Sequence, residues 1–443
     1  MITAMIVIFV IGYVLIACEH TLKINKSTFA LIMCGVLWTV YVTMAGDPNL
    51  DHDMMVLLGD TCEVLIFLIG AMTIVEHIDR YGGFNFITQH IHAKSKKELM
   101  WILALFTFFM SAVLDNMTTT IIMVMMLRRL LTDQKERWLF ASVIVLAANS
   151  GGAWSPIGDV TTIMLWMDDK VTSGSLILNL LIPSLVSVIV PLLIATHFIK
   201  DNKFDHVAMK SNATVSPLAA KYPNLSKAML IIGVVALLFV PVFKTITHLP
   251  PFMGMMISLG VVWLITEVLL TRMHINPELG GRVSQTVRHI DMPTILFFLG
   301  ILMAVNALQQ AGVLASVANG MNTTIQEPFT IATLIGMLSS VVDNVPLVAA
   351  CIKMFSDMPA LQAISLDYAH YFIEDGLFWH LLTFTAGVGG SLLIIGSTAG
   401  VVAMGIEKIP FFWYLKRITI MGLLGYLAGV ALIYLESLCP FFL

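Results

Sequence analysis

The sequence predicts an all-α integral membrane protein built from two inverted-topology repeats, and three observations carry this prediction. Of its 443 residues, 58% are hydrophobic and only 12% are charged, with a mean hydropathy of +0.90, whereas soluble domains carry about 25% charged residues. Apolar stretches of about 20 residues, each long enough to cross a bilayer as a helix, recur from end to end. Two further apolar stretches carry the pattern Ser-x-x-x-Asp-Asn, at Ser111 to Asn116 and at Ser339 to Asn344.

The remaining apolar stretches are expected to form spanning helices, in chain order 2–18, 28–45, 61–77, 138–167, 175–198, 227–246, 252–271, 291–307, 376–404 and 411–434. The first is expected to stay in the membrane, because it lacks the basic leading region and the cleavage site of a secretory signal. The acidic segment 47–60 is expected to be a loop. The five cysteines show no metal-like spacing and are expected to pack as inert side chains.

The two stretches with the Asp-Asn pairs, about 99–130 and 329–356, do not fit as single spans. If the first crossed the membrane, the lysines before it would lie opposite the arginines after it, which the positive-inside rule disfavours. If both are re-entrant hairpins that enter and leave on one side, nearly all basic residues fall on the cytoplasmic side. Only Lys170, Lys244 and Lys353 then remain outside, where both chain termini are also expected. The basic residues therefore favour two hairpins.

These hairpins divide the chain into two repeats and a linker. The first repeat is expected over 1–199, a cytoplasmic linker over 200–226 and the second repeat over 227–443. Each repeat has five spans, one hairpin and one broken helix, at about 138–167 and 376–404. An odd number of crossings turns the second repeat upside down relative to the first. Inverted repeats with broken helices are the architecture of secondary transporters.

The first hairpin tip supplies the first candidate site, with Ser111, Asp115, Asn116 and Thr118. The helix must end at this tip, so backbone groups lose their partners there. Such side chains also cap helices, which is the purely structural interpretation. An ionisable group at this depth is costly unless it faces a partner or water, and Ser or Asn could cap without a charge. Asp115 is therefore predicted to bind protons or cations.

The helix expected over 138–167 supplies the second candidate site. It contains Gly151, Gly152, Pro156 and Gly158, so it must unwind midway. Unwinding exposes carbonyl oxygens and half-helix ends, which are the usual surroundings of a bound monovalent cation. Asp159 stands at the start of the second half-helix, where the helix dipole favours a negative charge. The residues predicted to bind a cation or proton around this break are Asn149, Ser150, Asp159, Thr161 and Thr162.

The second half of the chain repeats this arrangement without its second acid. Its candidate residues are Ser339, Asp343 and Asn344 at the hairpin tip, and Ser391 and Ser397 at the helix break. Ser397 occupies the position that corresponds to Asp159. The first half is therefore predicted to hold the tighter cation site.

The chemistry of these residues favours a cation over an anion. No Lys or Arg lies within either hairpin tip or either helix break, and an anion site would need such donors. Carboxylate, hydroxyl and carbonyl oxygens are the ligands of hard cations. Three carboxylates in one poorly solvated cavity cannot all be ionised without compensation, so they should titrate as a coupled set. Na⁺ can replace the protons that neutralise them, and this competition amounts to an exchange mechanism.

At these residues the chain resembles the NhaD family of Na⁺/H⁺ antiporters, within the ion transporter superfamily that includes the ArsB permeases. The resemblance spans essentially the whole chain and is carried by Ser111-(x)3-Asp115-Asn116-Met117-Thr118-Thr119-Thr120, by the block Asn149 to Thr162 and by Ser339-(x)3-Asp343-Asn344. It implies exchange of Na⁺ and Li⁺ for H⁺. We expect no cofactor, and we expect Asp115 and Asp159 to be the Na⁺ or Li⁺ ligands, with Asp115, Asp159 and Asp343 alternately holding protons and the cation. The resemblance also implies a bacterial inner membrane or a plastid envelope, a homodimer and an elevator-like movement.

Other functions make different predictions. A permease for arsenite or a dicarboxylate, coupled to Na⁺ or H⁺, would place substrate-binding donors at the two tips, and the local negative charge argues against a dianion. A channel would need a continuous lined pore. An enzyme is not expected, because no nucleophile–His pair or metal-ligand set is present in the sequence.

Overall fold

The computed structural model describes residues 2–17, 19–45, 50–84, 93–199, 222–273, 282–325, 327–341, 343–355 and 370–438, and the structural statements below concern these ranges. Their regular elements are helices, without a strand among them. In chain order they are α1 (Ile2–Ala17), α2 (Glu19–Leu22), α3 (Lys26–Ala45), α4 (Leu50–Arg80), α6 (Lys96–Leu114), α7 (Asn116–Leu130), α8 (Gln134–Ala153), α9 (Val160–Met167), α10 (Ser173–His197), α12 (Pro223–Thr247), α13 (Pro251–Arg272), α14 (Val283–Thr286), η3 (Val287–His289), α15 (Met292–Gln310), α16 (Val313–Thr324), α17 (Pro328–Leu338), α18 (Asn344–Phe355), η4 (His370–Phe372), α20 (Leu377–Gly389), α21 (Thr398–Glu407), α22 (Phe411–Arg417) and α23 (Thr419–Ser437).

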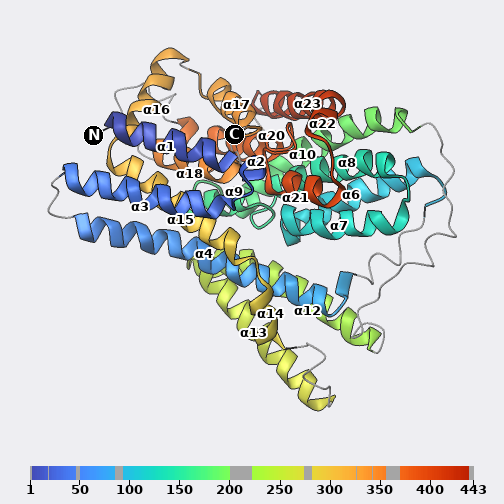
Figure 1. Cartoon of the computed structure of the whole chain (residues 1–443). Coiled ribbons are helices and arrows are strands. Elements are labelled where there is room, and N and C mark those ends of the chain that lie inside the picture. Colours follow the sequence, from blue (N-terminus) through green and yellow to red (C-terminus); the bar gives the residue numbers. More distant parts are fainter. Residues whose placement is uncertain are drawn as a thin grey trace.

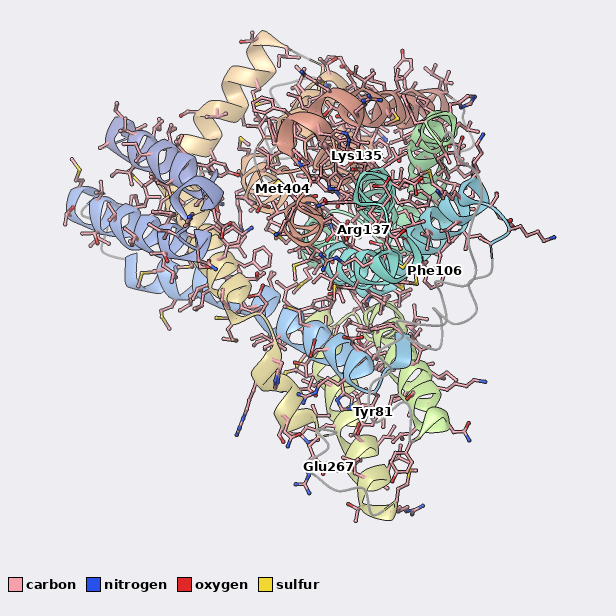
Figure 2. The ribbon with its side chains drawn as sticks, turned by 45° about the vertical axis from the view of Figure 1, so that its right-hand side comes forward. Tyr81, Phe106, Lys135, Arg137, Glu267 and Met404 are labelled. Carbon is pink, nitrogen blue, oxygen red and sulfur yellow. The ribbon has the colours of Figure 1, made fainter. Side chains whose placement is uncertain are left out.

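The helices form two bundles that lie side by side (Figure 1). In the first bundle α1, α3, α4, α12, α13 and α15 pack on one another, and in the second α6 to α10, α17 and α20 to α23 do so. Helix α18 lies between the bundles, since it contacts α15 on one side and α9 and α20 on the other, and α16 packs on α15 and α18. Side chains labelled in Figure 2 mark the two bodies, with Tyr81 and Glu267 at the first bundle and Arg137 and Met404 in the second.

The helical membrane fold is confirmed. Eight helices of the described ranges are long and apolar enough to cross a membrane. Each predicted span coincides with one helix, except 138–167, 376–404 and 411–434, which each contain two. The two helix breaks are also where the sequence predicts them. The chain leaves the helix after Ala153 and resumes it at Val160, and it does the same after Gly389 and before Thr398.

Some boundaries differ from the predictions. The part of the acidic segment 47–60 that is described begins at Leu50 and belongs to α4, so the loop prediction was wrong there; hydropathy does not detect a helix that extends past the apolar region. Helix α16 was not predicted, and a break at Ile418 separates α22 from α23. Most of the predicted linker lies outside the described residues, and its last residues are helical because α12 begins at Pro223.

Each hairpin packs closely on a broken helix through glycine. A Cβ atom at Gly151 of α8 would overlap the main-chain carbonyl of Phe108 on α6, and one at Gly389 of α20 would overlap the carbonyl of Gly336 on α17. These positions tolerate no side chain, because the obstructing atoms belong to the backbone and cannot turn away. In both halves of the chain, a glycine therefore allows the broken helix to approach the backbone of a hairpin helix.

Replacing Gly151 with Ala is expected to destabilise the protein by about 1–3 kcal/mol, the usual cost of overpacking. The measurement is the melting temperature of the detergent-purified protein, followed by tryptophan fluorescence. Gly174→Ala on α10 is the control, because nothing lies within 4 Å of its added Cβ; this change should be neutral or slightly stabilising. Equal melting temperatures for the two variants would contradict the packing argument.

Candidate functional site

The first hairpin turns at a single residue, Asp115, which ends α6 and caps α7. Its carboxylate accepts hydrogen bonds from the Thr118 amide (2.9 Å) and the Thr118 hydroxyl (2.8 Å), so the capping interpretation holds for this residue. Its backbone has φ 76° and ψ 157°, a region that is almost reserved for glycine and costs other residues about 1–3 kcal/mol. Such strain at a non-glycine residue is typical of functional sites.

The second hairpin turns at Asp343, before α18. Its Oδ1 atom accepts a hydrogen bond from the Val345 amide (3.3 Å). Both tip aspartates thus hold the start of the following helix, and the residue after each of them is an asparagine.

The two asparagines reach from the hairpin tips to one buried carboxylate, that of Asp159. Asn116 donates from Nδ2 to Asp159 Oδ2 at 2.8 Å, and Asn344 donates to the same oxygen at 3.3 Å. The other oxygen, Oδ1, accepts from the Thr161 amide at 3.2 Å, because Asp159 caps α9. The residue is only 2% exposed. Asp159 is therefore the point at which both hairpins meet a broken helix.

A chain of hydrogen bonds continues from this point to the second broken helix. Asn116 also donates to Asn149 Oδ1 (3.1 Å), and Asn149 donates to Ser397 Oγ (2.8 Å). Ser397 in turn caps α21 by accepting from the Gly400 amide (3.1 Å). Ser397 thus stands at the start of its half-helix as Asp159 does, but without a charge.

Other predicted residues support the framework. Ser111 Oγ donates to the Ala148 carbonyl (2.6 Å), and Ser339 Oγ donates to the Ala386 carbonyl (2.8 Å), so each serine ties a hairpin to a broken helix. The remaining contacts are made by Ser150 Oγ, which accepts from Ser187 (2.9 Å); by Ser391 Oγ, which donates to the Val388 carbonyl (2.6 Å); and by Thr162 Oγ1, which donates to the Gly152 carbonyl (3.4 Å).

The charged surroundings of Asp159 and Asp343 differ. In the described part of the chain, no lysine, arginine or histidine forms an ion pair with Asp159. Asp343, by contrast, pairs with Lys26 at 3.0 Å. The hairpin tips contain no basic residue in sequence, but a basic residue from elsewhere in the chain lies beside one of them in space. No sequence pattern indicated Lys26, because it lies more than 300 positions from Asp343 and the basic-residue pattern placed it in a cytoplasmic loop.

Unused hydrogen-bonding groups and small cavities adjoin the site. The buried Thr161 hydroxyl, next to Asp159 in the chain, forms no hydrogen bond of good geometry, and the same holds for Thr119 and Thr120. A cavity of about 50 Å³ borders Asp115 and Asn116 on the side of α4, α12 and α15. A second, also of about 50 Å³, borders Lys26, Asp343 and Ser397, and Thr398 lines both. Each space could hold a few waters or a small ion.

Two pairs of consecutive helices, α6–α7 and α17–α18, and two broken helices meet around a buried carboxylate within a helical membrane protein. This arrangement is typical of membrane transport proteins. Residues 2–371 match the family model described as citrate transporter, CitMHS. The chain is 40% identical to "Sodium/proton antiporter 2" of Arabidopsis thaliana over 432 residues, which covers 96% of this chain and 97% of that protein. It is 31% identical to "Na(+)/H(+) antiporter NhaD" of Vibrio cholerae over 473 residues, covering 97% and 90%, respectively.

The chain belongs to the NhaD-type Na⁺/H⁺ antiporter family, within the wider group that the CitMHS model describes. This membership confirms the resemblance found in the sequence, and it places the protein among transporters and not among enzymes.

Proposed function

We propose that the protein is a secondary active transporter that exchanges Na⁺, and Li⁺, for H⁺ across a membrane. The observation that carries this proposal is the Asp159 carboxylate, which is buried, has no cationic partner among the described residues and is contacted by both hairpins. Relatives of this chain bear the names of sodium/proton antiporters.

The exchange follows from the cost of a buried charge. An ionised carboxylate removed from water and without a partner costs several kcal/mol, so Asp159 must be compensated by a bound proton or by a bound cation. The two states exclude one another. If the carboxylate is carried from one side of the membrane to the other only in these two compensated states, Na⁺ moving one way is exchanged for H⁺ moving the other way.

The neighbours of Asp159 can serve both states. In the structure the Asn116 and Asn344 amides donate to the carboxylate, and a rotation of either amide presents its oxygen to a cation in the same place. The Thr161 hydroxyl, next to this carboxylate, can supply a further oxygen ligand. Carboxylate, amide and hydroxyl oxygens are the ligands that hard cations prefer.

Asp115 is proposed as the second exchanging carboxylate and Asp343 as the third. Asp115 lines a cavity that opens the site toward the first bundle, and its strained backbone holds its carboxylate at the hairpin tip.

The proposed movement is a displacement of the second bundle against the first. The proposal includes the two inverted repeats, 1–199 and 227–443, and the homodimer expected from the family. The movement is supported by the division into two bundles, because both small cavities are lined by residues of both bundles. A bacterial inner membrane or a plastid envelope is the proposed location, because relatives come from bacteria and from a plant.

A carboxylate permease is the alternative, since the matching family model is named for citrate. A di- or tricarboxylate needs several cationic donors. Among the described residues, Lys26 is the cationic side chain that contacts the tips, and it is already paired. An anion substrate therefore has less support than a cation.

The test uses everted membrane vesicles from an antiporter-deficient bacterium that expresses the protein. A pH-sensitive dye is expected to dequench when Na⁺ or Li⁺ is added to respiring vesicles, and not when K⁺ is added. A response to citrate, succinate or arsenite without a response to Na⁺ or Li⁺ would replace the proposal by the alternative.

A further inference from the structure

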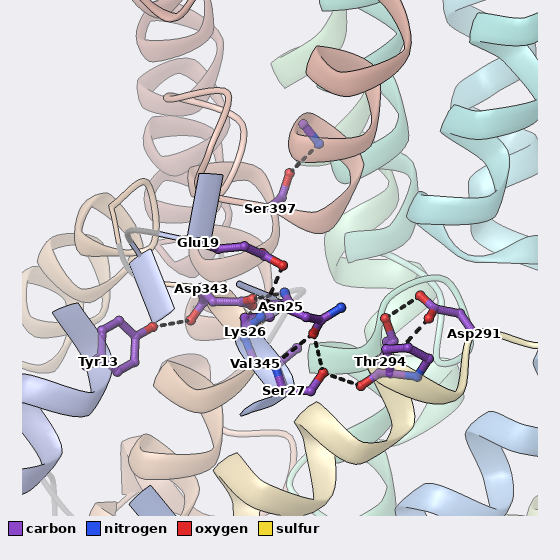
Figure 3. A network of polar contacts seen from close by, with 12 residues as sticks. Tyr13, Glu19, Asn25, Lys26, Ser27, Asp291, Thr294, Asp343, Val345 and Ser397 are labelled. Atoms are coloured by element: carbon purple, nitrogen blue, oxygen red, sulfur yellow. Dashed lines mark hydrogen bonds and ion pairs between the residues drawn. The ribbon is translucent and has the colours of Figure 1, made fainter. Parts of the chain in front are cut away.

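A lysine side chain of the protein pairs with the Asp343 carboxylate at the tip of the second hairpin. Lys26, the first residue of α3, places its ammonium 3.0 Å from Asp343 Oδ2 (Figure 3). The same ammonium lies 4.2 Å from the centroid of the Phe297 ring. The side chains of Lys26 and Asp343 are 18% and 14% exposed, so water screens this pair less than it would a surface pair. Asp343 is thereby compensated without a proton or a transported ion.

Lys26 is fixed to the first bundle. Its main-chain amide donates to Glu19 Oε1 (3.1 Å). The next residue, Ser27, donates from Oγ to the Pro293 carbonyl at the start of α15 (2.6 Å), and the Lys26 ammonium lies over the Phe297 ring of the same helix. These contacts hold the base of Lys26 to α2 and α15, so that the side chain extends from one bundle toward the other.

Asp343, by contrast, belongs to the second hairpin. Its carboxylate has one oxygen engaged with the Val345 amide and the other with Lys26. Tyr13 of α1 adds a weaker contact, from its hydroxyl to the Asp343 carbonyl (3.5 Å). The cavity beside this pair is lined by both bundles. A purely structural ion pair needs no such cavity beside it.

We propose that Lys26 is a tethered competitor of the transported cation: its ammonium occupies the Asp343 carboxylate in this conformation and must withdraw before Na⁺ can bind there. The inference rests on the proposed exchange of Na⁺ for H⁺. The physical reason is electrostatic, since a second positive charge within a few ångströms of the ammonium is repelled. Withdrawal of Lys26 also removes one of the contacts between the first bundle and the second hairpin.

Lys26→Met removes the charge and keeps an unbranched side chain. Because the apparent affinity for a ligand falls with the fraction of protein in the competent state, the variant should reach half-maximal dye response at about fivefold lower Na⁺ concentration than the wild type. Lys26→Arg keeps the charge and should retain a half-maximal concentration close to that of the wild type.

Lys244→Met is the matched control. Lys244 also pairs with an aspartate, Asp169 (2.8 Å), and lies over an aromatic ring, Trp166 (4.9 Å), but it touches neither hairpin tip. Its removal should leave the Na⁺ concentration dependence unchanged. A Lys26→Met variant with the wild-type half-maximal concentration, or with a higher one, would overturn the inference. A wild type without any Na⁺ or Li⁺ response would instead refute the proposed function.

The melting temperatures of single and double variants test the Lys26–Asp343 pair even if Lys26→Met transports poorly. Asp343→Asn leaves the ammonium without its partner, so it should lower the melting temperature of the purified protein. Adding Lys26→Met to Asp343→Asn should recover part of this loss. Additive effects of the two changes would mean that the pair is not coupled, and the inference would fail.

Discussion

Replacing Asp159 with Asn is expected to reduce the Na⁺-dependent dye response by about 100-fold or more, because it removes the charge that the cation and the proton share. Asn keeps the size of the side chain and is a good helix cap, so α9 should still begin at Val160. The measurement is the initial rate of dequenching in everted vesicles, with Na⁺ and with Li⁺, at equal amounts of protein in the membrane.

Asp133→Asn is the matched control for this change. Asp133 caps α8 as Asp159 caps α9, accepting a hydrogen bond from the Lys135 amide at 2.9 Å, but it is exposed. Its replacement should leave the response intact. If Asp159→Asn also responded to Na⁺ like the wild type, Asp159 would not be the exchanging group, and the site would have to be sought at Asp115 or Asp343.

The second large effect is expected from Glu407, whose replacement by Ala should lower the free energy of unfolding by about 3 kcal/mol. Glu407 ends α21, and its side chain is fully buried between Arg128 of α7 (2.9 Å) and Arg137 of α8 (2.8 Å). Arg137 is itself only 16% exposed, so removing Glu407 leaves a largely buried charge without its carboxylate. Arg128 is about half exposed, and water can compensate it.

Glu136→Ala tests whether the burial of Glu407 causes this loss. Glu136 pairs with Lys96 at 2.7 Å and is about one-third exposed, and such pairs contribute about 0.2–1 kcal/mol. The midpoints of thermal unfolding in detergent should therefore fall much further for Glu407→Ala than for Glu136→Ala. Similar midpoints for the two variants would show that the Glu407 pair is not a major support of the second bundle.

The interpretation of the hairpin tips changes in one respect when the structure is compared with the sequence. From the sequence, Asp115, Asp159 and Asp343 were predicted to form one carboxylate group, with Asp115 and Asp159 as the Na⁺ or Li⁺ ligands. In the structure each aspartate caps its own helix, and it is the following asparagine that reaches the shared centre. The asymmetry predicted between the halves is also present, because Ser397 stands where Asp159 stands in the first half. The central role of Asp159 stays a prediction until the variants are measured.

The sequence by itself determined the features that depend on local chemistry. Hydropathy defines helices that can cross a bilayer, and Gly151, Pro156 and Gly158 interrupt a helix because glycine lowers helix propensity and proline lacks an amide donor. Only the tertiary structure decided which distant groups meet: Lys26 with Asp343, Glu407 with Arg128 and Arg137, and both hairpin tips at Asp159. The physical reason is that these ion pairs and hydrogen bonds act over about 3–4 Å between residues as far as about 300 positions apart, and no local pattern encodes which bundles will pack together.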